Sequence, residues 1–160
     1  MNYHFRPAVN ADRDTVEGLV FGVLAEYGLS PDPSGTDSDL HDILSAYTSS
    51  GGAFDLLVDD SGLVVGSVGL FRVSVSTCEL RKMYLLRSVR GQGLGQRMLQ
   101  HALLRAEQLS FTRVVLETAS VLREAVALYE KYGFRPYEAE HLAPRCDVAY
   151  CLQLPRTKGR

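Results

Sequence analysis

The sequence predicts a single α/β domain, in which helices flank a mixed and mostly antiparallel sheet. Two observations lead to this fold class. Three strand-like runs in the middle of the chain are joined by short turns, which predicts antiparallel neighbours. Farther on, helical and strand patterns alternate, which predicts a crossover to a parallel strand. The 160 residues suit one domain. We expect it to occupy residues 1–155, followed by a frayed tail at 156–160.

The first elements are a strand and two helices. A short strand is expected at Tyr3–Ala8. Asp12 or Asp14 then caps a helix whose apolar residues recur at helical spacing until Gly28. A weaker helix is expected at about 38–47, because Leu40, Ile43 and Leu44 share one side.

The middle of the chain predicts three antiparallel strands. The runs are Phe54–Asp59, Leu63–Phe71 and Thr77–Leu86. Asp60-Ser61-Gly62 joins the first two as a tight hairpin turn. Such short connections leave no room for a crossover, so each strand pairs with the next.

The remaining elements follow a second pattern. A helix with one apolar stripe is expected at Gly93–Leu109, and a strand buried on both faces at Arg113–Thr118. A last helix at Leu122–Tyr132 precedes two closing strands, Phe134–Glu138 and Cys146–Leu154.

Composition and charge exclude several classes of protein. The net charge of −2 argues against a nucleic-acid partner, which a basic surplus would favour. The sequence has no apolar run of about 18 residues and no signal-peptide core, so we expect no membrane partner. Cys78, Cys146 and Cys151 lack CxxC spacing and the histidines are scattered, so we expect no metal site. Free thiols indicate a reducing, cytoplasmic location.

The most informative segment is the turn Arg90-Gly91-Gln92-Gly93-Leu94-Gly95, between a strand and the long helix. Its glycines lack a Cβ, so another molecule can approach the backbone closely. Unpaired amides and the positive end of the helix dipole make an anion site there. Arg87, Arg90 and Arg97 add positive charge. The spacing fits neither the dinucleotide fingerprint nor the triphosphate loop. We therefore expect a phosphate or pyrophosphate ligand.

These residues resemble the GNAT superfamily of N-acetyltransferases. The R-x-x-G-x-G of Arg90, Gly93 and Gly95 is similar to the family's acyl-CoA pyrophosphate motif. Glu79–Leu86 (ELRKMYLL) resembles the strand before it, and Ala125–Phe134 (AVALYEKYGF) resembles the family's last helix and the strand that follows. The resemblance covers about residues 54–154 and implies a V-shaped splay between the central strands.

The resemblance implies acetyl-CoA as cosubstrate and a set of residues that bind it. The backbone amides of residues 90–95, namely Arg90, Gly91, Gln92, Gly93, Leu94 and Gly95, would hold the pyrophosphate. The backbone of Met83 and Leu85 would pair with the pantetheine arm, as an added strand does. The family often has an asparagine where this chain has Leu122, so one side-chain contact to the cofactor is lost.

The resemblance also implies catalytic residues. Tyr129 matches the tyrosine that protonates the leaving thiolate, a role that suits a phenol neutral at pH 7. Glu79 is the candidate base, directly or through water, and Glu117 is a second candidate. Strand alternation would place Glu79 on one face with Arg81, Met83 and Leu85. Cys78 has no histidine near it in sequence, which argues against a covalent route.

The acceptor stays open at this point. A primary amine of a small molecule, such as an amino acid or a polyamine-like amine, is the first hypothesis, and an amine of a protein is the second. A CoA-binding sensor without turnover is the third. Carboxylates such as Asp32, Asp37, Asp39 and Asp42 would attract a cationic amine. Arg72, Arg81 and Lys82 would instead suit an acceptor that carries a carboxylate, such as an amino acid. A homodimer is compatible with the sequence.

Overall fold

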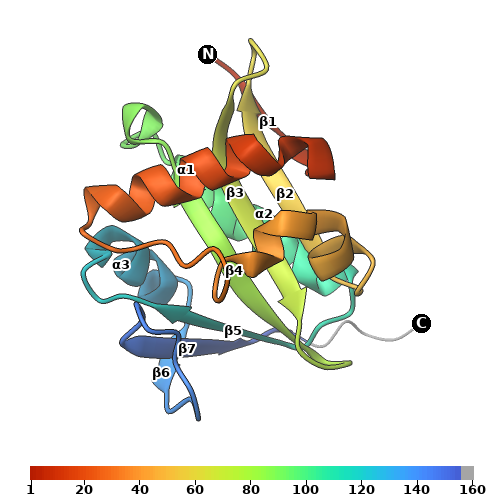
Figure 1. The fold of residues 1–160 in the computed structure, drawn as a ribbon. Helices are drawn as coiled ribbons and strands as arrows, with labels where there is room; N and C mark the ends of the chain where they lie inside the picture. The colour runs from red at the N-terminus through yellow and green to blue at the C-terminus, as the bar shows by residue number, and fades with distance from the viewer. Residues whose placement is uncertain (156–160) are drawn as a thin grey trace.

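The fold is a seven-stranded mixed sheet with helices on both faces (Figure 1). It is seen in a computed structural model, which describes residues 1–155, so the predicted frayed tail lies outside the described residues. The strand order is β1-β2-β3-β4-β5-β7-β6, and β4–β5 is the parallel pair. The predicted fold class is confirmed.

Most predicted elements lie within one or two residues of their expected positions. The strands are β1 (Tyr3–Pro7), β2 (Ala53–Asp59), β3 (Val64–Arg72), β4 (Thr77–Leu85), β5 (Arg113–Thr118), β6 (Arg135–Tyr137) and β7 (Val148–Gln153). The α-helices are α1 (Arg13–Glu26), α2 (Leu94–Gln108) and α3 (Arg123–Lys131). Within residues 1–155, no helix has both the length and the apolar character that a membrane span needs.

The prediction of a continuous α-helix near 38–47 is wrong. The segment forms a 3-10 helix, η2 (Ser38–Asp42), and a π-helical turn, η3 (Leu44–Thr48). Side-chain oxygens interrupt the helical hydrogen-bond ladder between them. The backbone N–H of Leu44 donates to Asn10 Oδ1 at 3.1 Å, and that of Ser45 donates to Asp42 Oδ1 at 3.0 Å.

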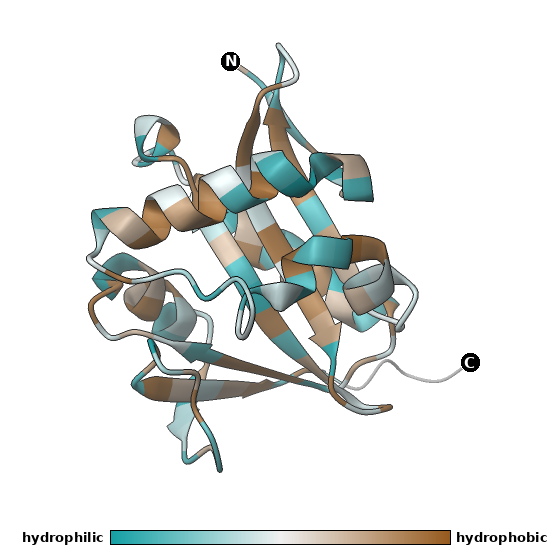
Figure 2. Cartoon of the chain, in the orientation of Figure 1, coloured by the Kyte–Doolittle hydropathy of each residue, from teal (hydrophilic) through white to brown (hydrophobic). Residues whose placement is uncertain are grey.

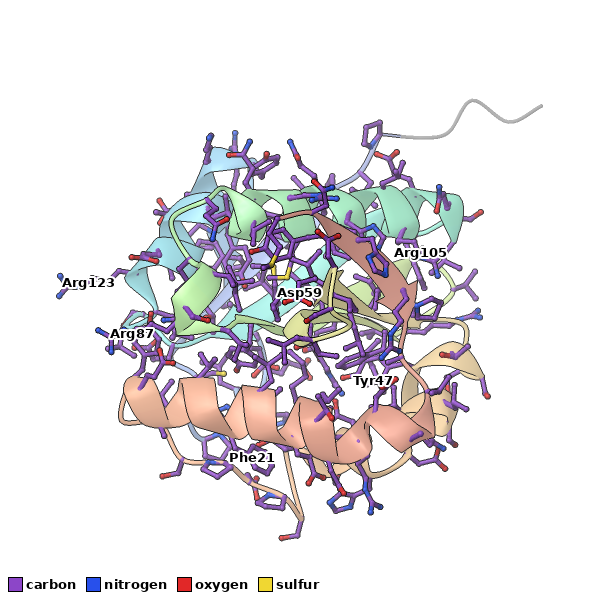
Figure 3. All side chains as sticks on the ribbon, turned by 90° about the horizontal axis from the view of Figure 1, so that it is seen from above. Phe21, Tyr47, Asp59, Arg87, Arg105 and Arg123 are labelled. Carbon is purple, nitrogen blue, oxygen red and sulfur yellow. The ribbon has the colours of Figure 1, made fainter. Side chains whose placement is uncertain are left out.

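The sheet separates two apolar layers. Alternate residues of β2 point to opposite faces, so Phe54 and Leu56 pack under α1 whereas Leu57 packs with Met98 of α2. Hydrophobic residues are concentrated on the strands between these layers (Figure 2). Figure 3 shows α1 and α2 on opposite sides of the sheet. Tyr47 lies on the same side of the sheet as α1.

The predicted splay lies between β4 and β5. Their registered pairs are Thr77↔Arg113, Cys78↔Val114 and Glu79↔Val115. Beyond Glu79 the two strands diverge, as Figure 1 shows, while β4 continues to Leu85. Backbone groups on this side of β4 therefore border a gap instead of a neighbouring strand.

A bulge in β4 changes which side chains share a face. The register with β3 shifts between Ser67 and Gly69, and Lys82 has a left-handed φ of 53°. The expectation of one face for Glu79, Arg81, Met83 and Leu85 is therefore wrong. Arg81 packs over Phe71 toward α1, but Met83 and Leu85 pack toward α2. The extra residue at the bulge reverses the alternation.

Candidate functional site

A cleft of about 470 Å³ opens in the splay between β4 and β5. One end is lined by the glycine turn at the start of α2. The other end is lined by carboxylates, among them Glu79 of β4 and Glu117 of β5. The cleft therefore joins an anion-binding end, here called the donor end, to an acidic end, here called the acceptor end.

The glycine turn leaves backbone donors free at the donor end. Gly91 and Gly93 have φ values of 82° and 78°, which favour glycine, and no atom lies within 4 Å of where a Cβ would stand. Gly93 is the N-cap of α2 and has no side chain to accept from the first helical amides. The turn therefore has amides and the positive end of a helix dipole directed outward, where an anion could approach.

The arginines near this turn serve other contacts. Arg90 donates from Nε and Nη2 to the Leu85 carbonyl at 3.0 and 2.8 Å, and from Nη1 to Glu26 at 2.7 Å. Arg97 donates to the Tyr3 carbonyl at 2.7 Å. Arg90 lines the cleft, and both guanidinium groups keep their charge near the turn while neighbouring oxygens fix their positions.

Of the other residues predicted at the donor end, most line the cleft and Gln92 does not. Gly91, Gly93, Leu94 and Gly95 line the cleft, and so do Met83 and Leu85 of β4. Gln92 is exposed, and its side chain donates to the Val89 carbonyl at 3.2 Å. The Leu85 carbonyl is already an acceptor for Arg90, so fewer of its backbone groups are open to a ligand. Arg87 is exposed at the edge of the molecule (Figure 3).

Tyr129 of α3 is one of the residues that line the cleft. Its side chain is buried, with the ring 5.7 Å from that of Phe134 and 6.5 Å from that of Tyr150. Burial raises the pKa of the Tyr129 phenol above its usual value. The phenol therefore stays protonated near neutral pH and has a proton to donate. Leu122, at the asparagine position of the family, also lines the cleft.

Glu79 and Glu117 lie on one face at the acceptor end. Glu79 pairs with Val115, and Glu117 is two residues farther along β5, so both carboxylates point the same way. Burial raises the pKa of Glu79, the Arg81 guanidinium opposes this, and Glu117 raises it further. Arg81 hydrogen-bonds Glu79, while Glu117 accepts from the Ala143 amide at 2.6 Å. A carboxylate with a raised pKa is a better proton acceptor from an ammonium group.

The cysteines supply no competing chemistry. Cys78 is fully buried, and burial raises the pKa of its thiol to about 12. Cys146 lines the cleft, and burial raises the pKa of its thiol to about 11. All three cysteines are free. Among residues 1–155, no cluster of histidine, cysteine and carboxylate side chains has the geometry of a metal site.

Comparison with known proteins identifies the family. Residues 22–134 match the model of the acetyltransferase (GNAT) family. An uncharacterized N-acetyltransferase of Escherichia coli K12, YjgM, is 38% identical over 128 residues, which are 77% of this chain and 76% of that protein. The chain belongs to the GNAT family. It is an acyltransferase, as the motifs indicated.

Solved structures of GNAT proteins share the fold. An acetyltransferase from Staphylococcus aureus Mu50 has a TM-score of 0.89 at 19% identity, over 96% of this chain and 100% of that one. A phosphinothricin acetyltransferase from Sinorhizobium meliloti, solved in complex with AcCoA, has a TM-score of 0.74 at 18% identity, over 99% and 95% of the two chains. At these identities the likeness establishes the architecture.

The structure adds a buried ion-pair network at the acceptor end of this GNAT protein. Asp37 accepts from both Arg145 terminal nitrogens at 2.7 Å, and Lys82 Nζ lies 3.0 Å from its Oδ1. Burial opposes ionisation of Asp37, but the bonds from Arg145 and the Asp32 amide, with the charge of Lys82, lower its pKa to about 2. The network joins the loop before η2, the β4 bulge and the loop before β7.

Sequence reasoning missed Arg145 and did not predict that Lys82 is buried. Arg145 is 108 residues from Asp37 in sequence, and no local pattern pairs them. Lys82 was considered as a cation for an acceptor with a carboxylate, yet its side chain is 4% exposed and its Nζ donates to the Thr36 carbonyl at 3.2 Å. The left-handed Lys82 backbone at the bulge turns the side chain toward η2. Arg72, the other cation considered, does not line the cleft.

Proposed function

We propose that this protein transfers an acetyl group from acetyl-CoA to a primary amine of a small molecule by direct attack. The observation that carries the proposal is the cleft, which joins the glycine turn of α2 to a carboxylate pair through the β4–β5 splay. Family membership supports an acyl-CoA donor, and the relative from Sinorhizobium meliloti was solved with AcCoA.

The residues of the donor end fit a diphosphate. Amides of residues 91–95 would donate to the pyrophosphate oxygens, because Gly91 and Gly93 leave the approach open. The open side of β4 near Met83 would pair with the pantetheine arm. The Arg90 guanidinium ties Leu85 to Glu26, so we assign Arg90 the role of holding the turn against α1.

Glu79 and Tyr129 would carry the proton transfers. Glu79, directly or through water, takes a proton from the acceptor ammonium, and the free amine attacks the thioester carbonyl. A C–N bond forms and the C–S bond breaks when the tetrahedral intermediate collapses. Tyr129 gives its phenolic proton to the departing thiolate, and the nitrogen of the intermediate loses its second proton, which passes through water to the Tyr129 phenolate. Glu79 then returns its own proton to solvent, so the amide and CoA leave with both groups restored. This sequence leaves no acyl group on the enzyme, in keeping with the buried Cys78.

A small acceptor is favoured over a protein by the ion-pair network. Asp37 and Arg145 link the loop before η2 to the loop before β7 at the acceptor end. A polypeptide lying across this end would have to pass between two loops that are joined by buried charges. Breaking such a pair costs about 3–5 kcal/mol.

The test is thiol release from acetyl-CoA in the presence of small primary amines. We expect release of CoA only when both substrates are present, with the N-acetyl product identified by mass spectrometry. An unstructured lysine-containing peptide serves as the control acceptor, and we expect slower turnover with it. Tight CoA binding without turnover on any amine would establish a CoA-binding module instead.

A further inference from the structure

We propose that the acceptor is a diamine-like molecule, whose second, non-reacting cationic group is bound by Asp39. This inference rests on the proposed function and specifies the acceptor of the same site. Asp39 lies in η2, lines the cleft at its acceptor end and keeps 7% of its side chain exposed. Its Oδ1 is the buried side-chain atom that accepts no hydrogen bond from any residue within 1–155.

A buried carboxylate oxygen without a donor is costly. Leaving such a group unsatisfied costs about 1–3 kcal/mol, and more for a charged group. Lys82 Nζ forms an ion pair with Asp39 Oδ1 at 3.4 Å, but it lies closer to Asp37 Oδ1, at 3.0 Å, and donates its hydrogen bond to the Thr36 carbonyl. A ligand ammonium that reaches Oδ1 from the cleft would therefore add a hydrogen bond to an oxygen that Lys82 contacts only as an ion pair, and the contacts of Lys82 with Thr36 and Asp37 would stay in place.

The charges at the acceptor end also favour a cationic ligand. The carboxylates outnumber the basic groups by one. The carboxylates are Asp39, Glu79 and Glu117, which line the cleft, and Asp37, which is buried behind the lining; the basic groups are Arg81, Lys82 and Arg145. An excess negative charge in a cleft with low-dielectric walls attracts a cation more strongly than the same charge in water.

The same inventory disfavours an acceptor with a carboxylate. Each basic group at this end is already ion-paired: Arg145 and Lys82 with Asp37, and Arg81 with Glu79. An amino acid would need one of these buried pairs to open, which would strand the carboxylate left behind. A second ammonium group needs no such rearrangement.

The positions of Asp39 and Glu79 separate the two amines of the ligand. Arg81 lies between the carboxylates, with Nε bonded to Glu79 and Nη1 4.0 Å from Asp39 Oδ2. Tyr47 donates to the same Oδ2 and holds Asp39 in place. One amine is then deprotonated at Glu79 while the other stays charged at Asp39.

The experiment compares three acceptors with the same carbon chain: butane-1,4-diamine, butylamine and 4-aminobutanoate. For the wild-type enzyme we expect kcat/KM for the diamine to exceed that for butylamine by about tenfold or more, the effect of one hydrogen bond to a charged group. We expect 4-aminobutanoate to be the poorest acceptor. A diamine-to-butylamine ratio near one, or a preference for 4-aminobutanoate, would overturn the inference.

Two variants locate the effect at Asp39. In Asp39→Asn the advantage of the diamine over butylamine should fall to about twofold or less, through KM more than through kcat. Asp42→Asn, at an exposed carboxylate outside the cleft, should keep the wild-type ratio. An unchanged ratio in Asp39→Asn would show that the second cation lies elsewhere.

A binding measurement separates this inference from the proposed function. Calorimetry on the CoA-loaded protein should show diamine binding that weakens about tenfold or more in Asp39→Asn. If no amine is acetylated but this binding is seen, the acetyl-transfer proposal fails and the cation site stands. If amines are acetylated and the diamine binds no better than butylamine, the cation site fails alone.

Discussion

The two ends of the cleft are built in different ways. The donor end consists of backbone: left-handed glycines, uncapped amides and the open edge of β4, all within residues 83–95. The acceptor end consists of side chains from three remote segments, joined through Asp37, Lys82 and Arg145. Under the proposed function, the donor end would bind a part that is common to all CoA thioesters, whereas the acceptor end would select among amines.

This contrast implies different tolerances to substitution. A change in the glycine turn should affect cofactor binding without affecting selection of the amine. A change in the ion-pair network should affect stability and selection of the amine, because a buried charge that loses its partner destabilises the fold. The predictions below test this division.

The largest effect is expected for Gly93→Glu. The substitution places a side chain at a φ of 78° and a negative charge at the anion site. We expect the Kd for CoA, measured by calorimetry, to rise by about 100-fold or more. The matched control is Gly62→Glu, at a hairpin glycine with a φ of 89° and open space around it. If both variants bind CoA like the wild type, the donor end is wrongly assigned.

A smaller effect is expected for Tyr129→Phe. Loss of the general acid should lower kcat by about 100-fold, with the KM for acetyl-CoA nearly unchanged. Tyr150→Phe is the control, because Tyr150 packs near Tyr129 but its hydroxyl donates to Glu130 at 3.3 Å, outside the cleft. Equal activity in Tyr129→Phe and the wild type would leave Tyr129 a purely structural residue.

The carboxylate pair predicts the acid limb of the pH–rate profile. Glu79 must be deprotonated to act as base, and its pKa is raised, so kcat/KM should fall as the pH drops through that raised pKa. The profile of Glu79→Gln should lack this acid limb, and its kcat/KM should be lower by about tenfold or more.

The neighbouring carboxylate supplies the control for this profile. Glu117→Gln removes a like charge, so the limb should move to lower pH, while glutamine still accepts from Ala143. An acid limb that persists in Glu79→Gln would point to Glu117 or to a water as the base.

The last prediction concerns the stability of the fold. Asp37→Asn should lower the free energy of unfolding by about 3 kcal/mol at neutral pH, because Arg145 and Lys82 keep their charges without this partner. The pKa of Asp37 is lowered to about 2, so its stabilisation is present above about pH 4 and is lost as the pH falls toward 2.

Denaturant unfolding at several pH values measures this effect. The difference between the wild type and Asp37→Asn should shrink by about 2 kcal/mol between pH 5 and pH 2. Asp14→Asn, whose side chain is 91% exposed, should match the wild type throughout. A difference that stays constant with pH would mean that the Asp37 carboxylate is not what stabilises the network.

Local patterns determined most of the fold and the glycine turn of the donor end. The alternating and helical periods reflect which faces are buried, so β2, β3, β5, α1 and α2 lie close to their predicted positions. Gly91 and Gly93 signal the anion site because only a residue without Cβ suits a left-handed turn that a ligand must approach. Such information is carried by neighbours in the chain.

The tertiary structure alone decided the acceptor end. No pattern in the sequence indicates the β4 bulge at Lys82, which reverses the faces of Met83 and Leu85. The pairing of Asp37 with Arg145 spans 108 residues and depends on how two loops meet over the sheet. Backbone geometry is set by local sterics and can be predicted from short segments, whereas the partners of a buried charge are set by packing of the whole chain.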